Sequence, residues 1–227
     1  MTARNIFIGF DEREAEVFHV CTQSIISLAK KPISITPLTL QSISGEYDMG
    51  MRDGSNAFVY TRFLCPYLSE FKGWSLFLDG DMVLLDDVNN LFDLADEDKA
   101  VVVVKHDYKT KATVKYMGAK NEDYPRKNWS SVILWNNAHP KNKILTPDLV
   151  KTQTGKFLHR FEWLDDADIG ELPIEWNWLP DEFGEHKEAK LLHYTLGSPC
   201  FPDYADTPMA SHYFHNLMKA TRVDRDW

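Results

Sequence analysis

The chain has 227 residues, of which 44% are hydrophobic and 26% charged, a composition typical of one globular domain with a sizeable core. Its formal net charge of −9 argues against a nucleic-acid backbone or an anionic membrane as the main partner. The three cysteines lack the spacing of a metal site or a disulfide framework, and no apolar run reaches membrane-spanning length. We therefore expect a cytoplasmic protein with no transmembrane segment.

The first hundred residues alternate between two hydrophobic patterns. Apolar residues spaced three or four apart indicate helices, and short continuous or β-branched runs indicate strands. In chain order, the predicted elements are a strand at Asn5–Gly9, a helix at Glu14–Ala29, a strand at Ile33–Leu40, a loop at Gln41–Gly54, a helix at Ser55–Phe71 that Pro66 should bend or break, buried strand segments within Trp74–Leu85, a short helix from an Asp87 cap to Ala95, and a strand at Ala100–Lys105.

The second half of the chain is less regular, with no internal repeat or linker. In chain order it holds a predicted loop at Asp107–Trp129, a strand at Ser131–Trp135, helical pieces within Thr146–Leu164 and a last short strand at Leu191–Tyr194. We therefore expect a single domain.

Polar side chains follow the predicted strands of the first half. The alternation of strands and helices predicts an α/β fold, with an open, mostly parallel sheet and helices on both faces. In such sheets, ligands bind beyond the carboxyl ends of the strands. Asp11, Asp79 and the pair His106-Asp107 each follow a strand, so we expect them to converge at one edge. This convergence favours a functional site there.

Asp79-Gly80-Asp81, between two apolar runs, is the most informative segment. Two carboxylates separated by one glycine can face a single divalent cation, and the glycine leaves room for a bound phosphate. An exposed Asp-Gly turn between two strands is the alternative. His193 is the best further ligand, because imidazole beside carboxylates suits Mn²⁺ better than Mg²⁺; a buried core histidine is the alternative here. Arg62 is either a solvated or salt-bridged arginine, or a fork that reaches a diphosphate.

Over nearly its whole length the chain resembles the nucleotide-diphospho-sugar transferases of the GT-A fold, most of all the family 8 glycosyltransferases. The segments that carry the resemblance are the first strand ending at Asp11, Tyr60-Thr61-Arg62-Phe63, the DxD signature in Phe77-Leu78-Asp79-Gly80-Asp81, Ser131-Val132-Ile133-Leu134-Trp135-Asn136, Asp166-Ala167-Asp168-Ile169, and His193-Tyr194. The resemblance implies a Rossmann-like domain in which residues 1–106 form a nucleotide-binding half. Residues 107–227 would form a half that binds the acceptor and completes the metal site.

The resemblance also implies an activity. A sugar would pass from a nucleotide-diphosphate sugar, most often a UDP-sugar, to the hydroxyl of a glycan or other acceptor, with retention at the anomeric carbon. Asp79, Asp81 and His193 would hold Mn²⁺ (or Mg²⁺) against the diphosphate, and Asp166 would be the catalytic residue near the reacting sugar. The residues expected to bind the donor are Phe10, Asp11, Arg13, Arg62, Asp79, Gly80, Ser131 and Gly197.

Two other functions remain open. A phosphohydrolase of the haloacid-dehalogenase type would use Asp79 as a nucleophile, since Asp79-Gly80-Asp81-Met82-Val83 also fits that signature, although the signature usually lies on the first strand. A catalytically inactive nucleotide-sugar binder is suggested by two departures from the family pattern. Ala167 stands where the family usually has glutamine, and Ser198 where it has lysine.

Overall fold

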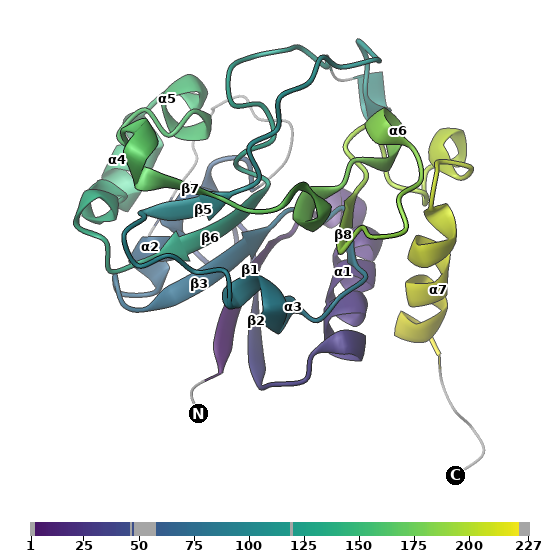
Figure 1. The fold of residues 1–227 in the computed structure, drawn as a ribbon, viewed down its shortest axis with the longest axis horizontal. Coiled ribbons are helices and arrows are strands. Elements are labelled where there is room, and N and C mark those ends of the chain that lie inside the picture. The colour runs from purple at the N-terminus through teal and green to yellow at the C-terminus, as the bar shows by residue number, and fades with distance from the viewer. Residues whose placement is uncertain (1–2, 46, 48–57, 119, 223–227) are drawn as a thin grey trace.

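The computed structural model describes residues 3–45, 47, 58–118 and 120–222 (Figure 1). Its strands are β1 Arg4–Gly9, β2 Ile33–Leu38, β3 Trp74–Leu78, β4 Met82–Leu84, β5 Val101–Val103, β6 Val132–Asn136, β7 Ile169–Glu171 and β8 Leu191–His193. Its α-helices are α1 Ala15–Leu28, α2 Cys65–Leu68, α3 Val88–Phe92, α4 Pro147–Thr152, α5 Gly155–His159, α6 Pro180–Phe183 and α7 Ala210–Ala220. Short 3-10 helices lie at Glu12–Glu14, Thr61–Leu64, Tyr116–Gly118, Pro140–Ile144, Asp166–Asp168, Ile174–Asn177 and Pro202–Tyr204.

Six strands form one large sheet in the order β2-β1-β3-β6-β5-β7, and β4 pairs with β8 in a small second sheet. β1 is parallel to both β2 and β3, β5 is parallel to β7, and β6 lies antiparallel between β3 and β5. The predicted mixed, mostly parallel sheet is therefore confirmed, with β6 as the reversed strand. Because β6 is reversed, its beginning lies at the same edge as the ends of β1 and β3.

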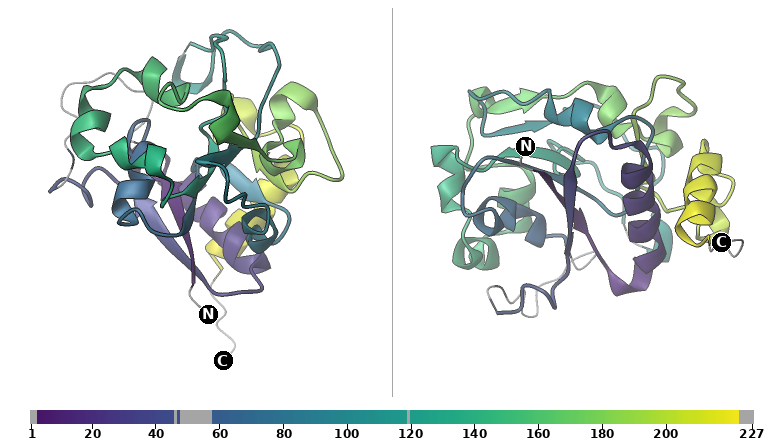
Figure 2. Two further views of the ribbon diagram at one scale, coloured as in Figure 1. Left: turned by 60° about the vertical axis from the view of Figure 1, so that its left-hand side comes forward. Right: turned by 90° about the horizontal axis from the view of Figure 1, so that it is seen from below.

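Helices cover both faces of the large sheet (Figures 1 and 2). On one face, side chains such as Phe77 and Trp135 pack with residues of α2, α4 and α5. On the other face, neighbours in the same strands, such as Leu76 and Leu134, pack with α1 and α3. Burial on both sides explains why β3 and β6 are continuous apolar runs in the sequence.

The acidic segment connects the two sheets. β3 ends at Leu78 in the large sheet, and after Asp79-Gly80-Asp81 the chain enters β4, which pairs antiparallel with β8. In that pairing Met82 lies opposite His193. The segment does join two strands, but the alternative of an exposed turn is wrong, because Asp79 and Gly80 are buried and Asp81 is partly buried.

Several predicted helices are confirmed, and one is corrected. α1 lies within one residue of its predicted bounds, Asp87 caps α3 by accepting a hydrogen bond from the Asn89 amide, and 146–164 forms the two helices α4 and α5. The predicted helix at Ser55–Phe71 begins outside the described residues, and from Thr61 the chain forms a 3-10 turn followed by α2. Pro66 stands in the first turn of α2, where its missing N–H costs no helical hydrogen bond.

The sequence patterns did not predict β7 or α7. β7 has only three residues, too few for a periodic signal. α7 carries Ala210, Tyr213 and Leu217 at helical spacing on its inward face, a stripe that the sequence analysis did not single out. Tyr213 ties α7 to α1, because its hydroxyl donates to Glu16 at 2.8 Å. No helix in the described part of the chain is both long enough and apolar enough to cross a membrane.

Gly80 offers a test of the crossing between the sheets. A Cβ added there would lie 2.7 Å from the backbone carbonyl oxygen of Gly9. Because the contact is with backbone, we expect Gly80→Ala to lower the free energy of unfolding by about 1–3 kcal/mol. Gly155→Ala is the control, since its Cβ would meet its nearest neighbour at 3.5 Å. Urea denaturation measures both variants, and equal midpoints would contradict the close approach.

Candidate functional site

A cavity of about 410 Å³ opens at the edge where β1 and β3 end and β6 begins. Further walls come from the segment 115–128 and from the end of β8. The residues predicted as site residues that line it are Asp11, Arg13, Arg62, Asp79, Gly80, Asp81, Ser131 and His193. The structure thus brings together side chains from both halves of the sequence.

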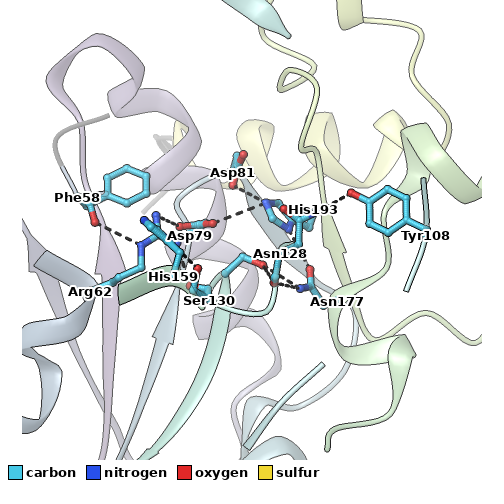
Figure 3. Close-up of polar contacts among 11 residues, drawn as sticks. Phe58, Arg62, Asp79, Asp81, Tyr108, Asn128, Ser130, His159, Asn177 and His193 are labelled. Carbon is cyan, nitrogen blue, oxygen red and sulfur yellow. Dashed lines mark hydrogen bonds and ion pairs between the residues drawn. The ribbon is translucent and has the colours of Figure 1, made fainter. Parts of the chain in front are cut away.

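Asp79, Asp81 and His193 form a cluster in this cavity (Figure 3). One ligand atom from each residue lies within 4.8 Å of the others, and His193 Nε2 is 3.3 Å from Asp81 Oδ1 and 3.8 Å from Asp79 Oδ2. The cluster follows from the topology, since Asp79 directly follows β3 and Asp81 directly precedes β4, which pairs with β8. Two carboxylates and one imidazole are a suitable donor set for a divalent cation.

The state of Asp81 shows that these residues fit a cation. Its Oδ1 atom is buried and receives no directed hydrogen bond from the described residues, including from His193 Nε2. Burial alone would raise the pKa of Asp81, but the positive charge of a protonated His193 ring and of Lys115 holds it below the ordinary value. A buried, ionised oxygen without a donor is costly. A divalent cation bound between the three side chains would remove that cost.

Arg62 is buried and faces the same cluster. Its Nη2 atom lies 2.8 Å from Asp79 Oδ1, and its Nη1 donates to the Ser130 carbonyl oxygen at 2.9 Å. The guanidinium also lies 4.9 Å from the centre of the Phe77 ring. Burial raises the pKa of Asp79, and the charge of Arg62 opposes that rise. Arg62 is therefore an ion-paired arginine on the cavity wall, and the solvated alternative is wrong.

Asp11 lines the cavity as half of an ion pair. Arg13 donates from Nε to Asp11 Oδ1 at 3.0 Å and from Nη2 to Oδ2 at 2.7 Å, a two-point contact between a guanidinium and a carboxylate. Asp11 also caps the 3-10 helix that follows β1, because it accepts a hydrogen bond from the Arg13 backbone amide at 3.0 Å. This side of the cavity presents an arginine and an aspartate together.

The described lining of the cavity is balanced in charge although the whole chain is acidic. Among the described residues, it holds equal numbers of acidic and basic side chains, whereas the chain has 34 acidic and 25 basic residues. The acidic ones are Asp11, Glu14, Asp79, Asp81 and Glu122, and the basic ones are Arg13, Arg62, Lys115, Lys120 and Lys127. The three lysines come from the predicted loop Asp107–Trp129. The abundance of lysine in that loop was the only sequence feature that pointed to a role in binding.

Two further cavity residues escaped the sequence analysis. Lys127 is buried and donates to Asn121 Oδ1 at 2.6 Å, and its burial lowers the pKa of Lys127 to about 8. His159 Nδ1 lies 2.7 Å from Ser130 Oγ, and burial lowers the pKa of His159 to about 3. His159 is thus a neutral side chain at physiological pH. Neither residue lies near a strand end in the sequence.

The structure does not bring three of the predicted site residues to the cavity lining. The Asp166 side chain is 89% exposed and pairs with Arg126. The Phe10 ring packs edge-on against Phe18 at 5.3 Å. Gly197 makes room for an aromatic ring, because a Cβ there would lie 2.4 Å from the side chain of Tyr204. The catalytic role of Asp166 and the donor-binding roles of Phe10 and Gly197 stay predictions that these positions do not support.

The chain is similar in sequence to a known plant protein. Protein CDI of Arabidopsis thaliana is 42% identical over 229 residues, an alignment that covers 97% of this chain and 88% of that protein. No protein-family model matches the chain.

Solved glycosyltransferases share its fold. The bifunctional glycosyltransferase WbbM matches with a TM-score of 0.66 at 17% identity, and GlyE of Streptococcus pneumoniae with 0.64 at 14%. The matches cover 95% and 96% of this chain, which spans only 50% of WbbM and 61% of GlyE. The galactosyltransferase LgtC matches with a TM-score of 0.56 at 16% identity, over 98% of both chains. The predicted GT-A fold is therefore confirmed.

Glu14 makes the stability of the folded protein depend on pH in a testable way. It accepts a hydrogen bond from the Tyr116 hydroxyl, and burial raises its pKa from 4.5 to about 7. Because the folded protein binds this proton more tightly than the unfolded chain, the associated stability is complete below pH 4.5 and is lost as the pH rises to about 7. We expect Glu14→Gln to raise the melting temperature at pH 8 relative to wild type, and to change it little at pH 4.

Glu12→Gln is the matched control, since Glu12 is exposed and belongs to the same 3-10 helix. Its melting temperature should follow that of the wild type at both pH values. Parallel pH profiles for all three proteins would contradict the role given to Glu14.

Proposed function

The chain belongs to the family of Protein CDI of Arabidopsis thaliana and has the GT-A glycosyltransferase fold, and from this we propose that it is a metal-dependent glycosyltransferase. It would move a sugar from a nucleoside-diphosphate sugar to the hydroxyl group of an acceptor. The observation that carries the proposal is the convergence of Asp79, Asp81 and His193 on a cavity at the sheet edge. That edge is where ligands bind in open α/β sheets.

The charges of the cavity support a metal-bound diphosphate as the ligand. Asp79, Asp81 and His193 would hold the cation, which when bound acts as a Lewis acid on the diphosphate and neutralises the charge that develops on the leaving group. Arg62 holds Asp79 in place and can offer guanidinium N–H groups to the diphosphate. Lys115 and Lys127 add positive charge to the cavity lining. Gly80 places no side chain between the two aspartates.

The finer assignments extend this proposal. We infer Mn²⁺ as the ion, because an imidazole accompanies the carboxylates. The Asp11–Arg13 pair, beyond the end of β1, would face the nucleoside, and a UDP-sugar is the proposed donor with retention at the anomeric carbon. We assign Asp166 no role in the proposed reaction, because its side chain is exposed and pairs with Arg126.

A nucleotide-sugar binder without catalysis is the second candidate. It is favoured by the position of Asp166, which leaves the cavity without the carboxylate that the family resemblance assigned to the reacting sugar. Such a protein would bind the nucleotide and the ion in the same way but neither transfer nor hydrolyse the sugar. The phosphohydrolase would instead release phosphate from a generic phosphate ester with Mg²⁺.

Asp81→Ala tests the proposed function. We expect wild-type protein to be stabilised by at least one nucleoside diphosphate or nucleotide-sugar in the presence of Mn²⁺, and less so in EDTA. Asp81→Ala should fold normally and lose the Mn²⁺-dependent part of the affinity by at least about tenfold, since the carboxylate faces the ligand. A thermal-shift screen of UDP, GDP, ADP and their sugars, followed by calorimetry, measures both effects.

Asp86→Ala is the matched control, because Asp86 follows β4 but lies outside the cavity lining. It should bind like the wild type. Nucleotide affinity that is unchanged in Asp81→Ala, or a wild type that binds no nucleotide with Mn²⁺, would overturn the proposed function. A donor-hydrolysis and transfer assay then separates the enzyme from the inactive binder.

A further inference from the structure

His193 makes a second contact, on the side of its ring away from the two aspartates. Its Nδ1 atom lies 2.9 Å from Asn177 Oδ1 (Figure 3). Asn177 Nδ2 lies 2.9 Å from Ser131 Oγ. Ser131 Oγ in turn lies 2.6 Å from the carbonyl oxygen of Asn128. These contacts form one continuous chain from a backbone carbonyl to the imidazole.

The Asn128 carbonyl oxygen fixes the direction of every hydrogen bond in this series of contacts. The Asn128 carbonyl can only accept, so the Ser131 hydroxyl donates to it. The hydroxyl oxygen is then the acceptor for the Asn177 NH₂ group, which also lies 3.5 Å from the Asn128 carbonyl. The amide oxygen of Asn177 therefore faces His193 and accepts from Nδ1–H. In the neutral ring, Nε2 is left with a lone pair that faces Asp79 and Asp81.

We propose that Asn177, oriented by Ser131, is a positioning residue that fixes His193 in the tautomer whose Nε2 can bind a divalent cation. The inference rests on the proposed function, because it needs the cation to have a role. A lone pair that faces two carboxylates is unfavourable unless a cation or a proton lies between them, and at a pH where the ring is neutral a divalent cation fills that place. The hydrogen-bond chain therefore prepares the site for the ion, in the way that partners of the second ring nitrogen orient metal-binding histidines in general.

Burial makes this arrangement rigid. Asn177 is 0% exposed, and Ser131 and His193 are 3% exposed, so water does not compete for the three hydrogen bonds. The backbone holds the two ends together as well, since the His193 amide donates to the Trp178 carbonyl oxygen at 2.8 Å. Asn177 thus cannot leave His193 without disturbing the strand that carries the ligand.

The inference also changes the expected role of Ser131, which the sequence analysis assigned to the donor. Its hydroxyl group donates to the Asn128 carbonyl oxygen, and its oxygen accepts a hydrogen bond from Asn177 Nδ2. Its effect on the donor would therefore pass through Asn177 and His193. We expect Ser131→Ala to weaken the site less than a change at Asn177, because the amide keeps its weaker contact with the Asn128 carbonyl.

Binding of Mn²⁺ alone provides the test, since it requires no knowledge of the sugar. Asn177→Leu has a similar size but offers no acceptor, and we expect it to bind Mn²⁺ about 10–100-fold more weakly than wild type in calorimetry. Asn177→Asp keeps an acceptor for Nδ1–H and should bind within a few-fold of wild type or more tightly. Asn137→Leu is the matched control, because Asn137 is also 0% exposed but hydrogen-bonds Ser75, away from the cavity.

A second readout reports the tautomer directly. Long-range ¹⁵N–¹H correlation spectra of the metal-free wild type at pH 8 should show the His193 proton on Nδ1, and Asn177→Leu should lose that preference. A proton on Nε2 in the wild type, normal Mn²⁺ affinity in Asn177→Leu, or an Asn177→Asp variant as weak as Asn177→Leu would each overturn the inference. A wild type that binds no divalent cation would instead remove the metal site itself, and the two failures are therefore distinguishable.

Discussion

The burial of two carboxylates at the crossing between the sheets is the constraint on which this molecule depends. Asp79 and Asp81 are held there because β3 ends in the large sheet and β4 begins in the small one. Ionised groups in such a place need opposite charge close by. The chain supplies Arg62 on one side and His193 on the other, and leaves a buried oxygen of Asp81 without a donor among the described residues. That arrangement is understandable as a site for a cation and costly otherwise.

The charge of the cavity has to be judged separately from the charge of the whole chain. A formal net charge of −9 would repel a nucleoside diphosphate at long range. In the part of the cavity lining that the structure describes, five basic side chains offset five acidic ones before any cation is counted. A bound divalent ion would make this region positive, which matches the charge of a diphosphate. Local composition thus decides which ligands the protein can hold.

The parts of the fold that follow from strand burial could be predicted from the sequence. Continuous apolar runs identified the central strands, and the acidic residues just beyond Gly9 and Leu78 identified the functional edge. Contacts set by tertiary packing could not be predicted. Asn177 lies in a 3-10 turn without a periodic pattern, and Lys127 lies in a long irregular segment. The exposure of Asp166 depends on how that segment and Arg126 fold, which no local pattern encodes.

The distribution of the three proposed cation ligands along the chain has a consequence for biosynthesis. A nascent polypeptide that has emerged only as far as β7 already carries both aspartates, but it lacks β8. Among the described residues, β8 is the only strand that pairs with β4, and it carries the imidazole of His193. High affinity for the proposed ion would therefore arise only after β8 has been translated and has docked against β4. Because ligand binding adds to folding free energy, the ion would favour completed molecules over truncated ones. Loading of the ion would thus act as a check that synthesis has reached the C-terminal part of the domain.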